Sequence, residues 1–180
     1  MLQERGHRVV GIDYDDPKFE LDEFVKADLS QGLPLDGRRF DVVLLADVLE
    51  HMLDPRRLLL NARDRLASGG KLLVSLPNVA HWSVRAQVAM GKFDYTNKGI
   101  LDRGHVRFFT RASAERLFAE AGLRPISRRT TPVPWENVIP PALGRFVTDK
   151  VEKTDYLFTR LDPNLFAYQH LFELVPTEAT

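Results

Sequence analysis

The sequence predicts an α/β fold with a doubly wound, mostly parallel sheet. Short apolar, β-branched runs alternate along the chain with segments of helical periodicity. That order is typical of parallel sheets with helices on their faces. The run at residues 41–45 is apolar enough for a strand buried on both faces, and polar side chains follow it directly. In an open α/β sheet, ligands bind at this carboxyl edge of the strands.

The composition indicates one globular domain of 180 residues, 44% of them hydrophobic. Lys plus Arg and Asp plus Glu both number 25, which argues against broad binding to nucleic acid. There is no cysteine, so disulfides and thiolate chemistry are excluded. No apolar run approaches the roughly 20 residues of a membrane span, and the N-terminus lacks a signal-peptide core. We therefore expect a cytoplasmic protein with no membrane span and no nucleic-acid partner.

Two short strands are expected before the run at 41–45, at residues 8–12 and 25–27. Gly6 suits the end of a helix over residues 1–7. Between the two strands, Asp15-Asp16-Pro17 is typical of the start of a short helix or turn reaching Phe24. A loop rich in Gly, Pro and Asp follows.

A helix is predicted to begin at Asp54 and Pro55, with Asp54 as its N-cap. Its apolar stripe consists of Leu58, Leu59, Ala62 and Leu66. Gly69 and Gly70 then break the helix, and residues 71–76 form the next strand.

The rest of the chain continues the alternation. The expected elements are a helix at 81–90, an irregular connection at 91–106, a helix at 111–121 capped by Thr110, and a strand at 123–128. We divide the chain into a core over 1–128, a variable arm or cover over 129–164, and an antiparallel edge strand over 165–176. The arm holds four prolines within 130–141, followed by a helix at 142–151.

Three predicted strands end in acidic residues, Asp13, Asp28 and Asp47. Carboxylates at the strand ends of a doubly wound sheet can bind the hydroxyls and amines of a nucleoside. The alternative is that each is a turn or cap residue, since Asp is common there. Their occurrence at successive strand ends favours a nucleoside site.

An ordered set of motifs resembles class I S-adenosylmethionine-dependent methyltransferases. The motifs are VVGID at 9–13, ADL at 27–29, FDVVLLADVLEHMLDP at 40–55, LASGGKLLVSLPN at 66–78 and RFFTRASAERLFAEAGL at 107–123. The resemblance covers about residues 4–128. It is strongest to the small-molecule branch, which includes O-methyltransferases of quinone, glycan and lipid pathways. It implies a Rossmann-like fold and a single methyltransferase-like domain over 1–180.

The resemblance also implies roles for residues at the strand ends. Asp13 would bind the cofactor ribose, with Tyr14 beside it in the same site. Asp28 would face the adenine amine, and Leu29 would pack on the ring. The methionine end of S-adenosylmethionine would be lined by the pair Ala46 and Asp47.

One departure from the family concerns its first strand and glycine-rich turn, which cradle the cofactor. This sequence starts within what would be the following helix, so the first strand is expected to be missing. Three explanations are open. The chain is truncated, the strands at 8–12 and 41–45 pair directly, or a second chain supplies the strand.

Two histidines are candidates for catalysis. His51 is the better candidate for a base, because its ordinary pKa is near neutrality and it follows the ligand-facing strand. His105 lies where the resemblance places the acceptor. The alternative is a structural role for His51 and a solvent-facing position for His105.

A metal site is an alternative interpretation of the same residues, although none of them is predicted to be a metal ligand. Asp47, Glu50 and His51 are spaced i, i+3, i+4, which would place them on one helical face. With His105 or His81 they would suit a divalent ion. The pattern is similar to the metal-binding residues of RNA 2′-O-methyltransferases and some quinone O-methyltransferases.

Aromatic residues around 91–109 could wall an apolar acceptor pocket, although one of Phe108 and Phe109 is expected in the core. The gathered residues are Trp82, Phe93, Tyr95, Phe108 and Phe109. Residues 135–141 are interpreted as a substrate cover or a dimer arm. The basic residues Arg124, Arg128 and Arg129 are interpreted as a solvated face rather than an anion site.

The sequence thus predicts an S-adenosylmethionine-dependent methyltransferase that acts on a small-molecule, glycan or lipid hydroxyl. The alternative is an N-terminally truncated, non-catalytic methyltransferase-like module for binding or scaffolding. A nucleotide-dependent oxidoreductase is disfavoured, because the motifs after Asp28 fit the methyltransferases better. A homodimer is a further alternative.

Overall fold

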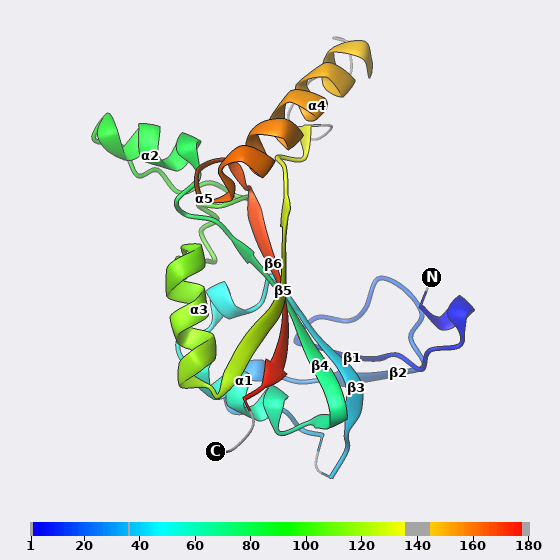
Figure 1. Cartoon of the computed structure of the whole chain (residues 1–180). Coiled ribbons are helices and arrows are strands. Elements are labelled where there is room, and N and C mark those ends of the chain that lie inside the picture. The colour runs from blue at the N-terminus through cyan, green and yellow to red at the C-terminus, as the bar shows by residue number, and fades with distance from the viewer. Residues whose placement is uncertain (1, 36, 136–144, 178–180) are drawn as a thin grey trace.

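The computed structural model describes residues 2–35, 37–135 and 145–177, with side chains from residue 150 onwards in the last range. Its strands form a two-stranded sheet and a four-stranded sheet (Figure 1). The predicted α/β class is confirmed. All strands of the larger sheet except one run in the same direction.

The smaller sheet pairs β1 (Val10–Asp13) with β2 (Glu23–Lys26) in parallel. The short 3-10 helix η1 (Gln3–Arg5) precedes it and ends at Gly6, whose φ of 80° is the left-handed conformation expected of this cap. The helix or turn predicted up to Phe24 is wrong in its extent, because β2 already begins at Glu23. The Glu23 carboxylate accepts hydrogen bonds from Arg38, which fixes the start of this strand.

The larger sheet has the strand order β3 (Phe40–Ala46), β4 (Leu66–Pro77), β6 (Gln169–Pro176), β5 (Leu123–Thr131). The last strand, β6, is antiparallel as expected, but its predicted place at the sheet edge is wrong. It lies between β4 and β5 and is hydrogen-bonded to both. The alternation of buried and exposed residues along a strand shows which face of the strand is covered. The place of the strand in the sheet depends instead on pairing with residues that are far away in the sequence.

One of the three explanations for the missing first strand, direct pairing of the strands expected at 8–12 and 41–45, is also wrong. β1 belongs to the smaller sheet and β3 to the larger one. Val42 and Leu44 of β3 are exposed at 52% and 59%. Their neighbours Val43 and Leu45 point into the core, so among the described residues only one face of β3 is well covered.

The turn after β3 leads through the 3-10 helix η3 (Leu49–His51) into α1 (Pro55–Arg63). Asp54 caps α1 by accepting a hydrogen bond from the Arg57 amide at 3.0 Å, as predicted. The helix ends before Leu66, whose assignment to the helical stripe is wrong. Leu66 instead opens β4 opposite Phe40. Gly70 is required there, since a side chain would lie 2.9 Å from two backbone oxygens.

Helix α3 (Arg111–Glu120) begins with a capping box between Thr110 and Ser113. α1 and α3 lie on the same face of the larger sheet (Figure 1), and the main core is buried between them and the strands. The largest core side chains are Leu49, Leu59, Leu72, Leu76, Phe118, Leu123 and Leu174.

The C-terminal third adds α4 (Arg145–Leu161) and the short α5 (Pro163–Phe166). The helix predicted at 142–151 is longer than expected at its C-terminal end, and residues 142–144 lie outside the described residues. Of the proposed cover at 135–141, only Trp135 is described. Its indole Nε1 donates to the buried Asp155 at 2.9 Å, which ties this segment to α4. The predicted strand from 165 begins at Gln169, because 163–166 are helical.

Helix α2 (Trp82–Ala89) stands apart from the main core, and His81 caps its first turn. None of the described helices combines the length and the apolar character that a membrane crossing requires.

Candidate functional site

The carboxyl end of β3 is held by side chains from two other strands, β4 and β6. Asp47 follows β3 with a φ of 53°, a left-handed conformation that a non-glycine residue rarely adopts. Its Oδ1 accepts a hydrogen bond from Ser75 Oγ at 2.7 Å, and Ser75 Oγ accepts one from the Asp47 amide. Gln169 Nε2 donates to both carboxylate oxygens at 2.9 Å. These bonds hold the turn in place directly before η3.

Just beyond this turn lies a cluster of three residues, Glu50, His51 and His105. Each offers one ligand atom, and these atoms all lie within 4.8 Å of one another. η3 supplies Glu50 and His51, while the long connection after α2 supplies His105. That connection is held against η3 because Val106 and Arg107 donate their amide hydrogens to the Glu50 carbonyl at 2.9 and 3.0 Å.

Backbone carbonyls orient both histidine rings. His51 Nδ1 lies 2.9 Å from the Gly104 carbonyl oxygen, and His105 Nδ1 lies 3.0 Å from that of Ile100. A carbonyl only accepts, so Nδ1 carries the proton in each neutral ring. Nε2 is then left with its lone pair in both. The two ring centroids are 4.8 Å apart.

Glu50 is the unusual member of the cluster. Its side chain is 1% exposed, and neither carboxylate oxygen has a hydrogen-bond partner among the described residues. Burial raises the pKa of Glu50 to about 7, and the nearby Asp47 charge adds to the rise. The His105 Nε2 atom lies 4.0 Å from Glu50 Oε1. A buried carboxylate without partners requires either a proton or a cation to be stable.

The cluster differs from the metal set considered from sequence. The structure brings together Glu50, His51 and His105, but the Asp47 carboxylate is directed to Ser75 and Gln169. His81 instead caps α2, with its Nδ1 2.7 Å from Ser83 Oγ. The donor set of one carboxylate and two imidazoles suits a divalent cation. Imidazoles anchored through Nδ1 to a carbonyl are also the usual arrangement around a bound metal.

The candidate cofactor residues at the other strand ends lie on the smaller sheet. The Ala27 amide donates to the Asp13 carbonyl at 2.9 Å, so the ends of β1 and β2 are adjacent. Asp13 is exposed, with Oδ1 accepting from the Asp15 amide at 3.1 Å. Tyr14 is 73% exposed.

Asp28 begins the 3-10 helix η2 (Leu29–Gln31) and accepts a hydrogen bond from the Ser30 amide at 2.8 Å. Hydrogen bonds from Ser30, first from its side chain and then from its backbone, lower the pKa of Asp28. A hollow of about 410 Å³ borders Asp28, Gln31 and Arg57. Leu29 is half-buried and packs against the main core.

Aromatic side chains adjoin His105. Phe93, Tyr95 and Phe108 form mutual ring contacts with centroids 5.6 to 6.1 Å apart, and Phe108 lies 6.3 Å from the His105 ring. Phe109 is 8% exposed and belongs to the main core, so one member of the 108–109 pair is core, as expected. Phe93 and Tyr95 remain 43% and 46% exposed.

Sequence reasoning did not assign Ser75 or Gln169 to the site. Ser75 could have been found from its position at the end of a predicted parallel strand. Gln169 carried no such signal, because the last strand was expected at the edge, away from Asp47. The burial of Glu50 depends on the connection that carries His105, and local sequence does not reveal it.

A family model described as a methyltransferase domain matches residues 1–128. A ubiquinone biosynthesis O-methyltransferase from Cereibacter sphaeroides is 32% identical over 111 residues, which are 59% of this chain and 44% of that protein. An uncharacterized Mycobacterium tuberculosis protein is 32% identical over 106 residues, 57% of this chain and 34% of that protein. The chain therefore spans less than half the length of these relatives.

Solved structures share the fold. A 1,6-didemethyltoxoflavin-N1-methyltransferase from Burkholderia thailandensis, with bound S-adenosylhomocysteine, has a TM-score of 0.59 at 16% identity. The match covers 98% of this chain and 64% of that one. An S-adenosylmethionine-dependent methyltransferase from Archaeoglobus fulgidus has a TM-score of 0.60 at 16% identity, covering 98% and 79% of the two chains.

Proposed function

The chain belongs to the methyltransferase domain family, and from that membership we propose that it transfers a methyl group from S-adenosylmethionine to a hydroxyl of a small-molecule, glycan or lipid acceptor. The observation that carries the proposal is the cluster of Glu50, His51 and His105 beyond the carboxyl end of β3. This is the edge of an α/β sheet where ligands bind. The O-methyltransferase similarity supports oxygen as the receiving atom.

We assign cofactor binding to the strand-end residues Asp13, Tyr14, Asp28, Leu29, Ala46 and Asp47. The donor and acceptor chemistry fits, since exposed carboxylates accept hydrogen bonds from ribose hydroxyls and from an adenine amine. Asp13 and Asp28 follow adjacent parallel strands, which supports their acting on one nucleoside. In the cofactor, the sulfonium supplies the methyl group by in-line displacement.

The chain must then position the acceptor and remove one proton. Methyl transfer forms an oxygen–carbon bond, breaks a sulfur–carbon bond and leaves a neutral thioether, so the hydroxyl proton must go to a base. His51 is suited to this role because its Nδ1 proton is held by the Gly104 carbonyl and Nε2 is free to accept. His105 is assigned with it as an acceptor-site residue. The exposed faces of Phe93 and Tyr95 support an apolar, ring-bearing acceptor.

A second candidate role for the same cluster is to hold a divalent cation. The specific observation in its favour is the Glu50 carboxylate, buried without a partner beside two imidazoles anchored through Nδ1. A bound cation would supply Lewis acidity that lowers the pKa of the acceptor hydroxyl. In that arrangement His51 is a ligand rather than the base.

The first test is calorimetric titration of the 180-residue chain with S-adenosylhomocysteine. We expect binding, and we expect Asp13→Ala to weaken it at least tenfold. Asp15→Ala is the matched control, because the Asp15 group that donates to Asp13 is its backbone amide, which the substitution keeps. Unchanged affinity in Asp13→Ala would remove Asp13 from the site. No binding by a folded sample would support the non-catalytic module instead.

The cation role has its own test. The protein is treated with a chelator, and its melting temperature is followed as Mg²⁺, Mn²⁺ or Zn²⁺ is added back. A cation held by the cluster should raise the melting temperature of the wild type but not of His105→Gln. If the chelator and the metals leave the melting temperature unchanged in both proteins, the cation role is wrong and the acid–base role remains.

A further inference from the structure

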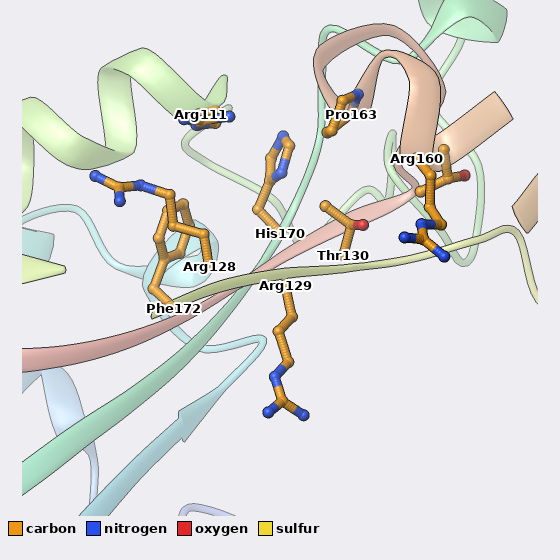
Figure 2. A pocket seen from close by; sticks show the side chains of 9 residues that line it. Arg111, Arg128, Arg129, Thr130, Arg160, Pro163, His170 and Phe172 are labelled. Carbon is orange, nitrogen blue, oxygen red and sulfur yellow. The ribbon is translucent and has the colours of Figure 1, made fainter. Parts of the chain in front are cut away.

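A second cavity, of about 240 Å³, lies between the start of α3, the C-terminal end of α4 and the strands β5 and β6. Figure 2 shows the cavity with basic side chains around it. It is lined by Arg111, Arg128, Arg129, Thr130, Thr159, Arg160, Pro163, His170 and Phe172. No member of this set belongs to the site proposed for methyl transfer.

Three of the four arginines line this cavity from three different elements, and the Arg160 guanidinium also lies over the Tyr156 ring, with its Cζ atom 5.9 Å from the ring centroid. Arg111 comes from α3, Arg128 from β5 and Arg160 from α4. Arg111 and Arg128 each use Nε to bind the same Glu115 oxygen, at 3.2 and 2.6 Å. The terminal guanidinium nitrogens of both residues have no hydrogen-bond partner among the described residues. The Glu115 carboxylate contacts two of these guanidinium groups, and no acidic residue of the described chain lines the cavity, so its lining carries a net positive charge.

His170 provides an independent sign that the cavity is built for a ligand. Its side chain is 3% exposed, and its Nε2 has no hydrogen-bond partner among the described residues. The ring stands between the Arg111 and Pro163 sides of the cavity (Figure 2). A buried ring nitrogen without a partner costs free energy unless something binds it.

The cavity lies on the opposite face of the sheet from Asp47. Successive side chains of a strand point to opposite faces. On β6, Gln169 binds Asp47, whereas His170 is buried with Phe172 on the face covered by α3. The cavity is thus separate from the Asp47 network, although adjacent residues of one strand serve both.

We propose that this cavity binds a phosphate group, either as inorganic phosphate or as part of a phosphorylated molecule. Three arginines from three different elements line the cavity, which suits an anion with acceptor oxygens on several sides. A carboxylate has only two oxygens in one plane and fits this arrangement less well. The inference goes beyond the proposed methyl transfer and does not depend on it. It also revises the interpretation of Arg128 as part of a solvated face.

The test is calorimetric titration of the 180-residue chain with inorganic phosphate, in a buffer without other oxyanions. We expect saturable binding that Arg128→Gln weakens about tenfold, the cost of one charge-assisted hydrogen bond. Arg129→Gln is the matched control. Arg129 is the next residue of the same strand, but its guanidinium points away from the cavity (Figure 2). Equal melting temperatures of the two variants establish that both fold.

Two outcomes would overturn the proposal. One is the absence of binding at millimolar phosphate. The other is equal weakening in Arg128→Gln and Arg129→Gln, which would mean that only the overall charge matters. Acetate in place of phosphate should bind at least tenfold more weakly. A titration with glycerol 3-phosphate, a phosphate monoester, distinguishes inorganic phosphate from a phosphorylated molecule as the ligand. If the monoester binds more tightly than inorganic phosphate, the ligand is a larger phosphorylated molecule. If it binds more weakly, the ligand is the free ion.

A pH titration tests the part played by His170. The charged groups around this ring are Arg111 and Glu115 from α3, Arg128 from β5 and Arg160 from α4. A bound anion favours the protonated ring, so affinity should rise as the pH falls. Sulfate is the probe, because its own charge stays constant over the range used. His170→Gln should abolish this pH dependence; if the dependence persists in the variant, His170 has no part in binding.

Discussion

Gln169 Nε2 lies 2.9 Å from both carboxylate oxygens of Asp47, although the two residues are 122 positions apart in the chain. The bond joins the end of β3 to the start of β6 across β4, whose Ser75 completes the network. Asp47 is also the non-glycine residue with a positive φ in the described chain. A strained backbone of this kind persists only where its surroundings hold it.

We predict that Gln169→Glu destabilises the protein more than Gln169→Met does. The Met variant loses two hydrogen bonds to a charged acceptor, at a cost of about 1.5–3 kcal/mol. The Glu variant in addition places a second carboxylate against Asp47, which opposes ionisation of both. Urea unfolding measures the difference. The difference in the free energy of unfolding between the two variants should increase from acidic to neutral pH. A constant difference would show that Asp47 and residue 169 do not interact.

A second prediction concerns Glu50, whose pKa of about 7 in the folded state lies above its ordinary value of 4.5. The native state therefore binds more protons than the unfolded state between these two values, so its stability falls as the pH rises through them. Across this pH range the free energy of unfolding should fall by a total on the order of 3 kcal/mol. Glu50→Gln should remove this dependence and be more stable than the wild type above neutral pH.

Chemical denaturation at several pH values, in a buffer that contains a chelator, measures the Glu50 effect without a bound cation. Glu115→Gln is the control, because the arginines around Glu115 lower its pKa and its contribution has the opposite sign. If the free energy of unfolding depends on pH in the same way in the wild type and in Glu50→Gln, ionisation of Glu50 does not destabilise the folded state.

A third prediction addresses His51 as the base in the proposed reaction. His51→Gln keeps a side chain that can donate to the Gly104 carbonyl but cannot accept a proton. Turnover should fall by a factor of about 100 or more, the usual contribution of general-base catalysis, while the affinity for S-adenosylhomocysteine changes little. Single-turnover kinetics and calorimetry separate the two effects. His7→Gln, in the exposed segment before β1, is the control, and equal turnover in both variants would give His51 a structural role.

A fourth prediction is that His170 makes the protein sensitive to acid. Burial, and then the Arg111 charge, lower the pKa of His170 from 6.5 to about 4. The unfolded state binds more protons between these values, so stability rises with pH across this window. His170→Gln should lose less stability than the wild type when the pH falls from about 6.5 to about 4. Added phosphate should stabilise both proteins through the arginines, but this stabilisation should grow toward low pH only in the wild type. Thermal unfolding with and without phosphate measures both effects.

Much of the fold could be predicted because its signals are local. Asp54 at the start of α1, Thr110 at the start of α3 and the apolar run of β3 each determine their element through neighbouring residues. The α/β class follows from the order of these elements. The roles of His51 and His105 as site residues stay a prediction, although the structure brings their rings into edge contact, with centroids 4.8 Å apart.

The errors arose where distant residues decide the outcome. Leu66 continues the helical stripe of α1, but pairing with Phe40 places it in β4. The place of β6 between β4 and β5 depends on hydrogen bonds along both of its edges, which no local pattern encodes. The cavity around His170 was missed for the same reason, since its arginines come from three separate elements.

The order of strands in the larger sheet also determines when this sheet can form during synthesis of the polypeptide. β6 is synthesised after the other five described strands, yet it fills the gap between β4 and β5. Until it leaves the ribosome, β5 has no partner strand in the larger sheet, and Phe118 of α3 lacks its ring contact with Phe172. A nascent chain that stalls before Gln169 would expose apolar surface and two open strand edges, which favour aggregation. Productive folding of the larger sheet is therefore a late event that depends on completion of β6.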